Sequence, residues 1–248
     1  MLNIFSRVRR KLANENRFLQ YSRYAIGEIV LVMVGILLAL QVNNWNEERN
    51  NSLIEQDYLK EMLEDFEINL KTSNRNIGRI EEILPHLIGL IDQSMAGKPT
   101  MPLDALNKAF SNITAMPAYS STDRVYNNLV GSGDLKLIRN GELKTKLANY
   151  YECLFVLNLV QDTHEMELVE SFQPYIIENL DYQAVNPSWL DDFLLPSPLE
   201  DNRILEVLND REFRNILTQK WVILTDLLNQ NRILRQVNLD MLELLSHL

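Results

Sequence analysis

The chain has 248 residues, 46% of them hydrophobic and 23% charged, and its formal net charge is −10. This acidic balance argues against a nucleic-acid-binding protein, which needs a basic surface. The single cysteine, Cys153, excludes an intrachain disulfide and a cysteine metal site. The low numbers of glycine and proline, eight of each, favour long helices over strands and turns.

The first 23 residues carry six Lys or Arg against one acidic residue, a net charge of +5, which leaves −15 for residues 24–248. Apolar residues recur between the basic ones at helical spacing, which predicts a basic amphipathic helix on the anionic inner leaflet of a membrane. The alternative is a disordered basic tail that only sets topology. The basic residues assigned to the membrane surface are Arg7, Arg9, Arg10, Lys11, Arg17 and Arg23.

The next stretch, "YAIGEIVLVMVGILLALQVNNWNE" (24–47), contains an apolar run of 19 residues, 24–42. A helix of that length rises roughly 28 Å, close to the hydrocarbon thickness of a bilayer. The basic flank before it remains on the cytoplasmic side. We therefore expect a transmembrane helix at residues 24–45 that acts as an uncleaved signal-anchor, in preference to a cleaved signal peptide or a buried core helix.

One face of this helix combines small residues with a carboxylate. Gly35 and Ala39 have the small-xxx-small spacing that allows a second helix to approach closely. Glu28 on the same face either hydrogen-bonds across such a contact or reaches headgroup water at the edge of the span. The predicted transmembrane association face consists of Glu28, Val32, Gly35, Ala39 and Val42.

The same stretch, together with "VYNNLVGSGDLKLIRNGELKTKLANYY" (125–151), resembles an uncharacterised bacterial family of single-pass membrane proteins. Members have a "YAIGEIVLVxxGILxALQxNNWNE" N-terminal span and an all-helical soluble part. The resemblance covers residues 1–60 and 120–155 best. It implies an architecture and a location, and it implies no activity and no catalytic residues.

Heptad-like spacing of the coiled-coil type follows the span and predicts that one helix continues out of the membrane. Pro85 lies inside the pattern and should kink or end the helix, and residues 92–102 have the composition of a loop. The residues expected on the packed stripe are Leu59, Leu63, Phe66, Leu70, Ser73, Ile77, Ile80, Leu84, Leu87 and Ile91.

Further helices are predicted at residues 103–113, 120–130 and 142–180, with a capping box at Ser120 and Asp123 and a turn at 131–141. The last of these helices has an apolar face that His164 extends, and we expect this histidine to be hydrogen-bonded in the core. The apolar members of that face are Leu143, Leu147, Tyr150, Leu154 and Leu157.

Residues 181–198 form a predicted loop with an unusual number of apolar side chains, which either fold over the end of the bundle or dock a partner or ligand. Asn209 and Glu212 predict a capping box for a final helix that runs to residue 248. The possible docking residues of the loop are Tyr182, Trp189, Phe193, Leu194 and Leu195.

The sequence thus predicts an all-α chain in three parts: a cytoplasmic segment (1–23), a transmembrane helix (24–45) and an extracytoplasmic bundle of four to five main helices (46–248). No nucleophile–base pair, metal constellation or paired-carboxylate motif is recognisable, so we expect no enzymatic activity, no cofactor and no metal.

The expected role is a structural or scaffolding component of the bacterial envelope, in the inner membrane. Its partners would be membrane lipid, a second copy or another membrane protein, with no nucleic acid. The alternative is a sensory bundle that binds a small ligand or partner and signals through a separate membrane protein.

Overall fold

The computed structural model describes residues 18–180 and 203–248, with side chains from residue 22 onward. Every regular element in these ranges is helical, which confirms the predicted all-α class. The chain divides into two compact units, Met1–Asp57 and Tyr58–Leu248. The elements are α2 (Phe18–Met95), α3 (Leu103–Ile113), α4 (Arg124–Ser132), the 3-10 helix η1 (Asp134–Leu137), α5 (Gly141–Glu167), the π-helix η2 (Leu168–Phe172), α6 (Gln173–Asn179), α7 (Arg203–Asn209) and α8 (Arg211–Ser246).

Helix α2 confirms the prediction of one helix that continues beyond the apolar run, but the expectation that Pro85 would end it is wrong. Pro85 and Glu81 are both exposed, so water can reach the Glu81 carbonyl that proline leaves without a helical donor. On the opposite side, Ile80, Leu87 and Leu90 are fully buried. This packing on both sides of the proline offsets the lost hydrogen bond and holds the helix together as far as Met95.

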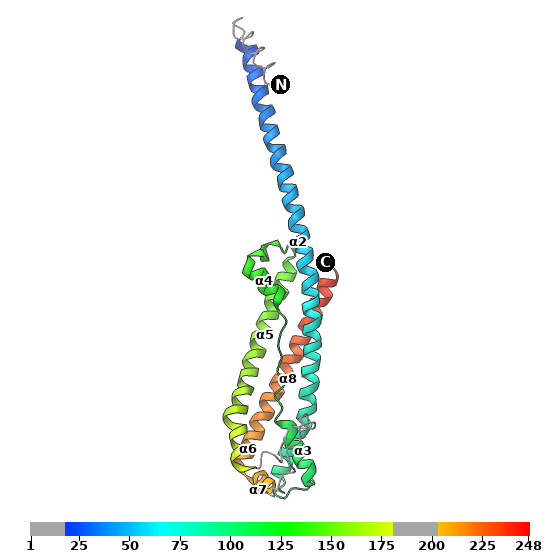
Figure 1. The fold of residues 1–248 in the computed structure, drawn as a ribbon, viewed down its shortest axis with the longest axis vertical. Helices are drawn as coiled ribbons and strands as arrows, with labels where there is room; N and C mark the ends of the chain where they lie inside the picture. Colours follow the sequence, from blue (N-terminus) through cyan, green and yellow to red (C-terminus); the bar gives the residue numbers. More distant parts are fainter. Residues whose placement is uncertain (1–17, 181–202) are drawn as a thin grey trace, which may run out of the picture. The chain divides into compact units, whose positions relative to one another are not determined.

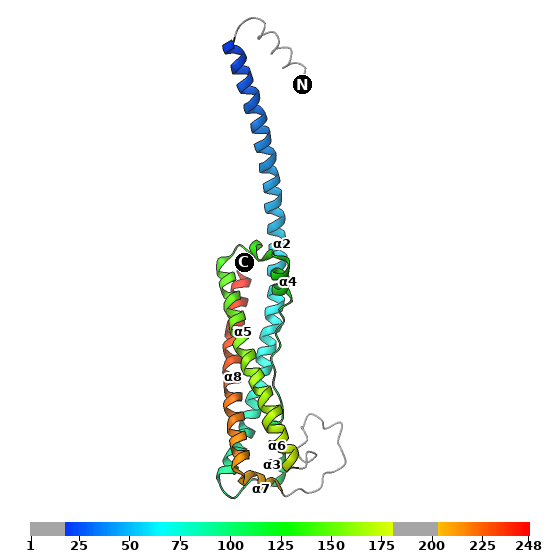
Figure 2. The ribbon, with the colours of Figure 1, turned by 90° about the vertical axis from the view of Figure 1, so that its left-hand side faces the viewer.

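In the second unit, the part of α2 from Tyr58 onward lies side by side with α5 and α8, as both views show (Figures 1 and 2). Helix α8 is antiparallel to α5, because Lys146 Nζ donates to the Asp240 carbonyl while Glu167 pairs with Lys220. Helices α3, α6 and α7 gather at one end of the three long helices, and α4 lies at the other end.

The core consists mainly of leucine and isoleucine stripes, and the predicted face of α5 is buried in full. The predicted stripe of α2 is only partly right: Phe66, Ser73, Ile77, Ile80 and Leu87 are buried, while the other five residues are half-buried. Apart from Ser73, the predicted stripe contained only apolar residues, so it missed the other polar residues that α2 buries. The polar residues that α2 buries are Asp65, Asn69, Ser73, Asn76 and Ser94.

A segment without regular structure, residues 115–123, runs along the long helices from α3 to α4 (Figure 2). Two side-chain amides hold its backbone. Asn69 donates to the Thr122 carbonyl (2.9 Å) and accepts from the Thr122 N–H (2.6 Å). Gln161 bonds both the N–H and the carbonyl of Tyr119 in the same way. These amides satisfy backbone groups that would otherwise lose their water on folding.

The helix caps differ from the predicted capping boxes. Helix α4 begins at Arg124, and the side chain of Asp123 makes no cap hydrogen bond. Instead, the carboxylate of Asp65 on α2 accepts from the Val125 N–H (3.1 Å) and from Arg124 (3.2 Å). The first turn of α4 is therefore capped from another helix, which local sequence could not reveal.

Helix α8 is capped one residue later than predicted: Asp210, not Asn209, accepts from the Glu212 N–H (3.0 Å). The predicted turn before α5 is confirmed. Gly133 ends α4 with φ of 76°, a left-handed conformation that glycine adopts without strain, and Asn140 caps α5 by accepting from the Leu143 N–H.

Candidate functional site

The predicted association face lies on the first part of α2, where no residue of the most apolar 18-residue window is buried and its mean hydropathy is 2.4. Val32, Ala39 and Val42 are exposed. A side chain added at Gly35 would meet no other atom within 4 Å. Within the parts of the chain that the structure describes, this is the helix long and apolar enough to cross a membrane.

Several predicted site residues lie outside the described residues. Of the basic residues assigned to the membrane surface, Arg23 is described and is exposed, while Arg7, Arg9, Arg10, Lys11 and Arg17 are not. The five docking residues between Tyr182 and Leu195 are also outside the described ranges. These assignments stay predictions.

The structure reveals a charged cluster in the interior of the second unit that the sequence did not predict. The Lys220 ammonium of α8 donates to Glu167 Oε2 of α5 at 3.2 Å, and the side chains are 0% and 1% exposed. The ammonium also lies 4.6 Å from the centroid of the Phe172 ring, a cation–π distance. Among the described residues, one hydrogen bond and one aromatic ring therefore stabilise a buried cation that has three N–H donors.

His164, one turn before Glu167 on α5, is fully buried beside this pair. Neither ring nitrogen has a hydrogen-bond partner among the described residues, and the same holds for Glu167 Oε1. The expectation of a hydrogen-bonded core histidine is therefore wrong in the described part of the chain. Buried polar atoms without partners cost free energy, so this cluster is a local weakness in the core.

The backbone changes conformation at the same place. Helix α5 ends at Glu167, and η2 continues it with the wider π-helical hydrogen bonding from Leu168 to Phe172. A π-helix adds a residue to the turn and changes which side chains face the core. Here Leu168 and Phe172 are both buried, and Phe172 is the residue whose ring contacts Lys220.

Burial shifts the protonation of all three groups. It lowers the pKa of Lys220 and raises that of Glu167, although each charge opposes the shift of the other. Burial, and then the nearby Lys220 charge, lowers the pKa of His164 to about 4. At neutral pH the imidazole is therefore uncharged, and proton uptake by it opposes the folded state.

A second polar layer in the same unit is neutral and has fewer unpartnered buried atoms: among its described residues, Asn238 Oδ1 is without a hydrogen-bond partner. Asn76 donates to Asn231 Oδ1 at 2.9 Å, and Asn231 in turn donates to the Leu227 carbonyl. Asn238 donates to Ser73 at 3.2 Å. Because the α8 partner number rises as the α2 number falls, these bonds fix an antiparallel register between the two helices.

A small cavity of about 10 Å³ lies near the start of α4, bordered by Asp65, Asn69 and Tyr150. This volume accommodates about one water molecule and is far below the few hundred Å³ of a metabolite site. Burial raises the pKa of the Tyr150 phenol, whose hydroxyl lies 3.3 Å from that of Tyr119. The arrangement therefore orders the interior and has no room for a substrate.

Comparison with family models gives one match, to a family of unknown function (DUF6090), over residues 28–174. That range is more than half of the chain. The chain belongs to the DUF6090 family. The match includes most of the apolar run, helices α3 to α5, His164 and Glu167, whereas Lys220 lies outside it. No curated protein and no solved structure matches the chain.

The DUF6090 family has no assigned activity, so any chemistry must be inferred from the residues of this chain. No group of three His, Cys, Asp or Glu residues that could hold a metal occurs in the described ranges. Lys220 and Glu167 are closed off from solvent, which prevents contact with a substrate in this conformation. The cluster places two charges inside the contact between α5 and α8, where their burial bears on the stability of the fold.

One signal in the sequence could have located Lys220. Along the face of the final helix that contains Ile216, Ile223, Leu227 and Leu234, the apolar residues are spaced by seven from 216 to 223 and from 227 to 234, with no apolar residue four positions after Ile216 or Leu227. The core positions within those gaps are occupied by Lys220 and Asn231, both fully buried. A polar residue at a heptad position between apolar neighbours is the pattern to look for.

Proposed function

We propose that this protein is a membrane-anchored interaction component of the bacterial envelope. In this proposal its N-terminus is cytoplasmic, one helix crosses the inner membrane and the helical domain is extracytoplasmic. Its role is structural or scaffolding, through assembly with itself or with another membrane protein, and no catalytic activity is assigned to it. The family of unknown function is compatible with such a role and adds no activity.

The observation that carries the proposal is the exposure of the apolar run in α2. Ten large apolar side chains between Ile29 and Leu40 are exposed on all sides of the helix. Exposing so much continuous apolar surface to water is unfavourable. Such a surface is typical of a segment that contacts lipid or another protein. The run's length matches the thickness of a bilayer, and the basic residues before it favour a cytoplasmic N-terminus.

Reporter fusions test the topology. An alkaline phosphatase fused at the C-terminus should be active, and a green fluorescent protein fused there should be dark, because the domain lies outside the cytosol. The protein should also need detergent for extraction from membranes. A cytosolic C-terminus or a soluble protein would overturn the proposal.

The association face is tested separately by cross-linking in membranes. Gly35→Leu should reduce cross-linked oligomers several-fold, because a large side chain there prevents close helix approach. Gly27→Leu is the matched control: the same substitution, also into open space, about 80° around the helix. Equal oligomer yields for both variants would show that the face is wrongly assigned while leaving the membrane anchor intact.

A further inference from the structure

The outward side of α5 and η2 carries a second apolar stripe that the described part of the chain leaves exposed. Phe155 is 70% exposed, and Leu159, Met166 and Val169 follow it at steps of four, seven and three residues. Those steps place all four side chains on one face of a helix. The opposite face of α5 forms the core, so this helix is apolar on two sides. A helix that is apolar on two sides normally has partners on both.

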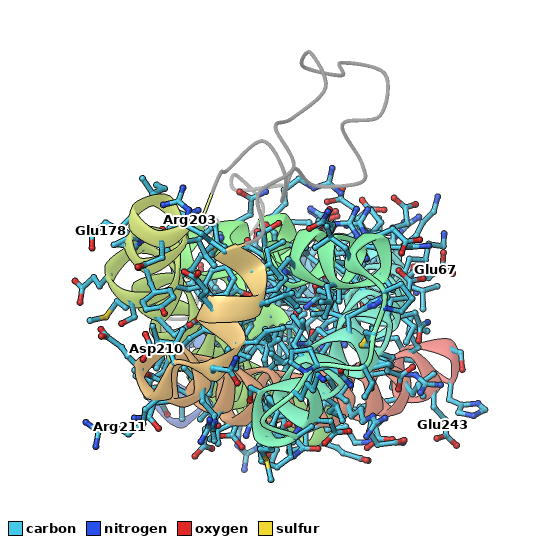
Figure 3. The ribbon with its side chains drawn as sticks, turned by 90° about the horizontal axis from the view of Figure 1, so that it is seen from below. Glu67, Glu178, Arg203, Asp210, Arg211 and Glu243 are labelled. Carbon is cyan, nitrogen blue, oxygen red and sulfur yellow. The ribbon has the colours of Figure 1, made fainter. Side chains whose placement is uncertain are left out.

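Acidic side chains border this stripe. Asp162 lies within it, and Glu152, Glu165 and Glu170 lie beside it, all of them exposed. On α6, Ile177 is 63% exposed, and Glu178 points outward from the helix (Figure 3).

Basic residues are missing from this part of the chain. The sequence contains no Lys or Arg between Lys146 and Arg203. The exposed faces of α2 and α8 in the same unit carry basic residues as well as acidic ones, for example Lys71, Arg75 and Arg232. An outward surface that is both apolar and purely acidic is thus specific to the α5–η2–α6 side.

From this surface we infer a docking site for a basic amphipathic helix of another protein. Apolar residues of such a helix, spaced by three and four, would pack on Phe155, Leu159 and Met166, in the helix-on-helix mode of peptide recognition. Its lysines or arginines would lie over Asp162 and the flanking glutamates, where opposite charges favour encounter and orientation.

Charge argues against a second copy and against an anionic lipid surface as occupants. A second copy of the same stripe would place Asp162 and Glu165 against acidic residues of its partner, which is repulsive. An anionic lipid surface would be repelled by the same carboxylates. The inference rests on the proposed function in one respect: the proposed topology keeps the chain's own basic segment, residues 1–23, on the cytoplasmic side and away from this face.

A synthetic peptide tests the inference with the full-length protein in nanodiscs of zwitterionic lipid. The probe is a 21-residue peptide with leucine at a and d of three heptads and lysine at the remaining positions. One control peptide replaces lysine by glutamate, and another replaces leucine by serine. The first peptide should bind at least tenfold more tightly than either control, because the site requires both charge and apolar contact. The peptide binds the nanodisc lipid equally with every protein variant, so a difference in affinity between variants reflects peptide binding to the protein surface.

Matched variants locate the site. Asp162→Lys/Glu165→Lys/Glu170→Lys should weaken peptide binding at least tenfold, and Leu159→Gln should weaken it severalfold. The control Glu61→Lys/Glu64→Lys/Glu67→Lys makes the same charge change on exposed residues of α2; Glu67 projects from the opposite side of the unit from Glu178 (Figure 3). Val222→Gln, an exposed apolar residue of α8, is the control for Leu159→Gln. Both controls should stay within twofold of the wild type.

Two results would overturn the inference. One is equal loss of binding in the α5 variants and their controls, which would show attraction by net charge alone. The other is an intermolecular disulfide formed by Leu159→Cys in a Cys153→Ser background but not by Val222→Cys, which would identify a second copy as the occupant.

Discussion

The neutral polar layer and the charged cluster both lie inside the second unit, and their buried polar side chains are stabilised in different ways. Between α2 and α8, neutral side chains bond to one another: Asn76 to Asn231, and Ser73 to Asn238. Between α5 and α8, Glu167 and Lys220 form an ion pair with one hydrogen bond, next to a histidine whose nitrogens have no partner among the described residues.

The difference shows what each layer contributes. A buried amide that finds its partner in only one alignment makes every other alignment costly, so the neutral layer favours a single register at a modest cost. A buried ion pair loses the hydration of two charges, and their attraction often does no more than balance that loss. The neutral layer is thus expected to stabilise one arrangement of helices, and the charged layer is expected to weaken the core unless both partners are present.

The largest expected effect comes from breaking the ion pair. Lys220→Met leaves Glu167 buried without its cation and should lower the free energy of unfolding by about 3–5 kcal/mol. Glu167→Leu/Lys220→Met removes both charges and should recover most of that loss. Urea or thermal unfolding followed by circular dichroism measures these differences.

Lys146→Met is the control for that pair of variants. Lys146 bonds the Asp240 carbonyl in the same α5–α8 contact but is partly exposed, so its loss should cost at most about 1 kcal/mol. A double variant as unstable as Lys220→Met would mean that the pair contributes net stability, and the contrast between the two layers would fail.

Protonation of His164 should have the next largest effect. Its pKa is about 4 in the folded protein and near the ordinary 6.5 when unfolded, so between these values the unfolded state binds more protons. Stability therefore falls as pH falls from about 6.5 to 4, by on the order of 3 kcal/mol. The nearby groups also titrate, and the raised pKa of Glu167 acts in the opposite direction.

The variant His164→Leu isolates the contribution of the histidine. Unfolding free energies of both proteins, measured from pH 7.5 to 4.5, should diverge, with the wild type losing more stability in acid. Parallel curves would show that the imidazole finds a proton acceptor or water inside the folded protein.

Breaking the neutral layer should have a smaller effect. Asn76→Leu leaves the Asn231 carbonyl oxygen without its donor and should cost about 1–3 kcal/mol. Asn76→Leu/Asn231→Leu should be closer to the wild type in stability but less specific in helix register. A double-mutant cycle gives the coupling energy, and disulfide trapping between α2 and α8 tests the register. A coupling near zero would contradict the role given to this layer.

The elements of the fold could be predicted because their signals are local. The helix at 103–113 matches α3 to the residue, the glycine turn before α5 is confirmed, and the apolar face of α5 is the buried one. Each depends on periodicity or turn chemistry within a few residues.

The charged cluster could not be predicted because its members come from different helices. Glu167 and Lys220 are 53 residues apart, and their pairing depends on the antiparallel packing of α5 and α8. The π-helix that precedes α6 shifts which side chains face the core, and rules based on α-helical spacing do not include such a shift. His164 could be placed on the core face, but its lack of partners depends on what surrounds it in three dimensions.

Asp65 offers the smallest and most local test, because both oxygens of this buried carboxylate have donors, whereas Glu167 Oε1 has none among the described residues. It accepts from the Val125 N–H and from Arg124 at the start of α4. Asp65→Ala removes this cap and should cost about 0.5–2 kcal/mol, the usual range for a helix N-cap.

Asp123→Ala is the matched control, since Asp123 occupies the N-cap position of α4 but its side chain makes no cap hydrogen bond. Urea unfolding should show a clear loss for the first variant and little change for the second. If Asp123→Ala were the more damaging of the two, the local capping rule would hold for α4 and the cap from α2 would be secondary. If only Asp65→Ala is damaging, a buried charge in this core is tolerated because donors reach it, and the weakness of the Glu167 cluster follows from its unpartnered atoms in the described part of the chain.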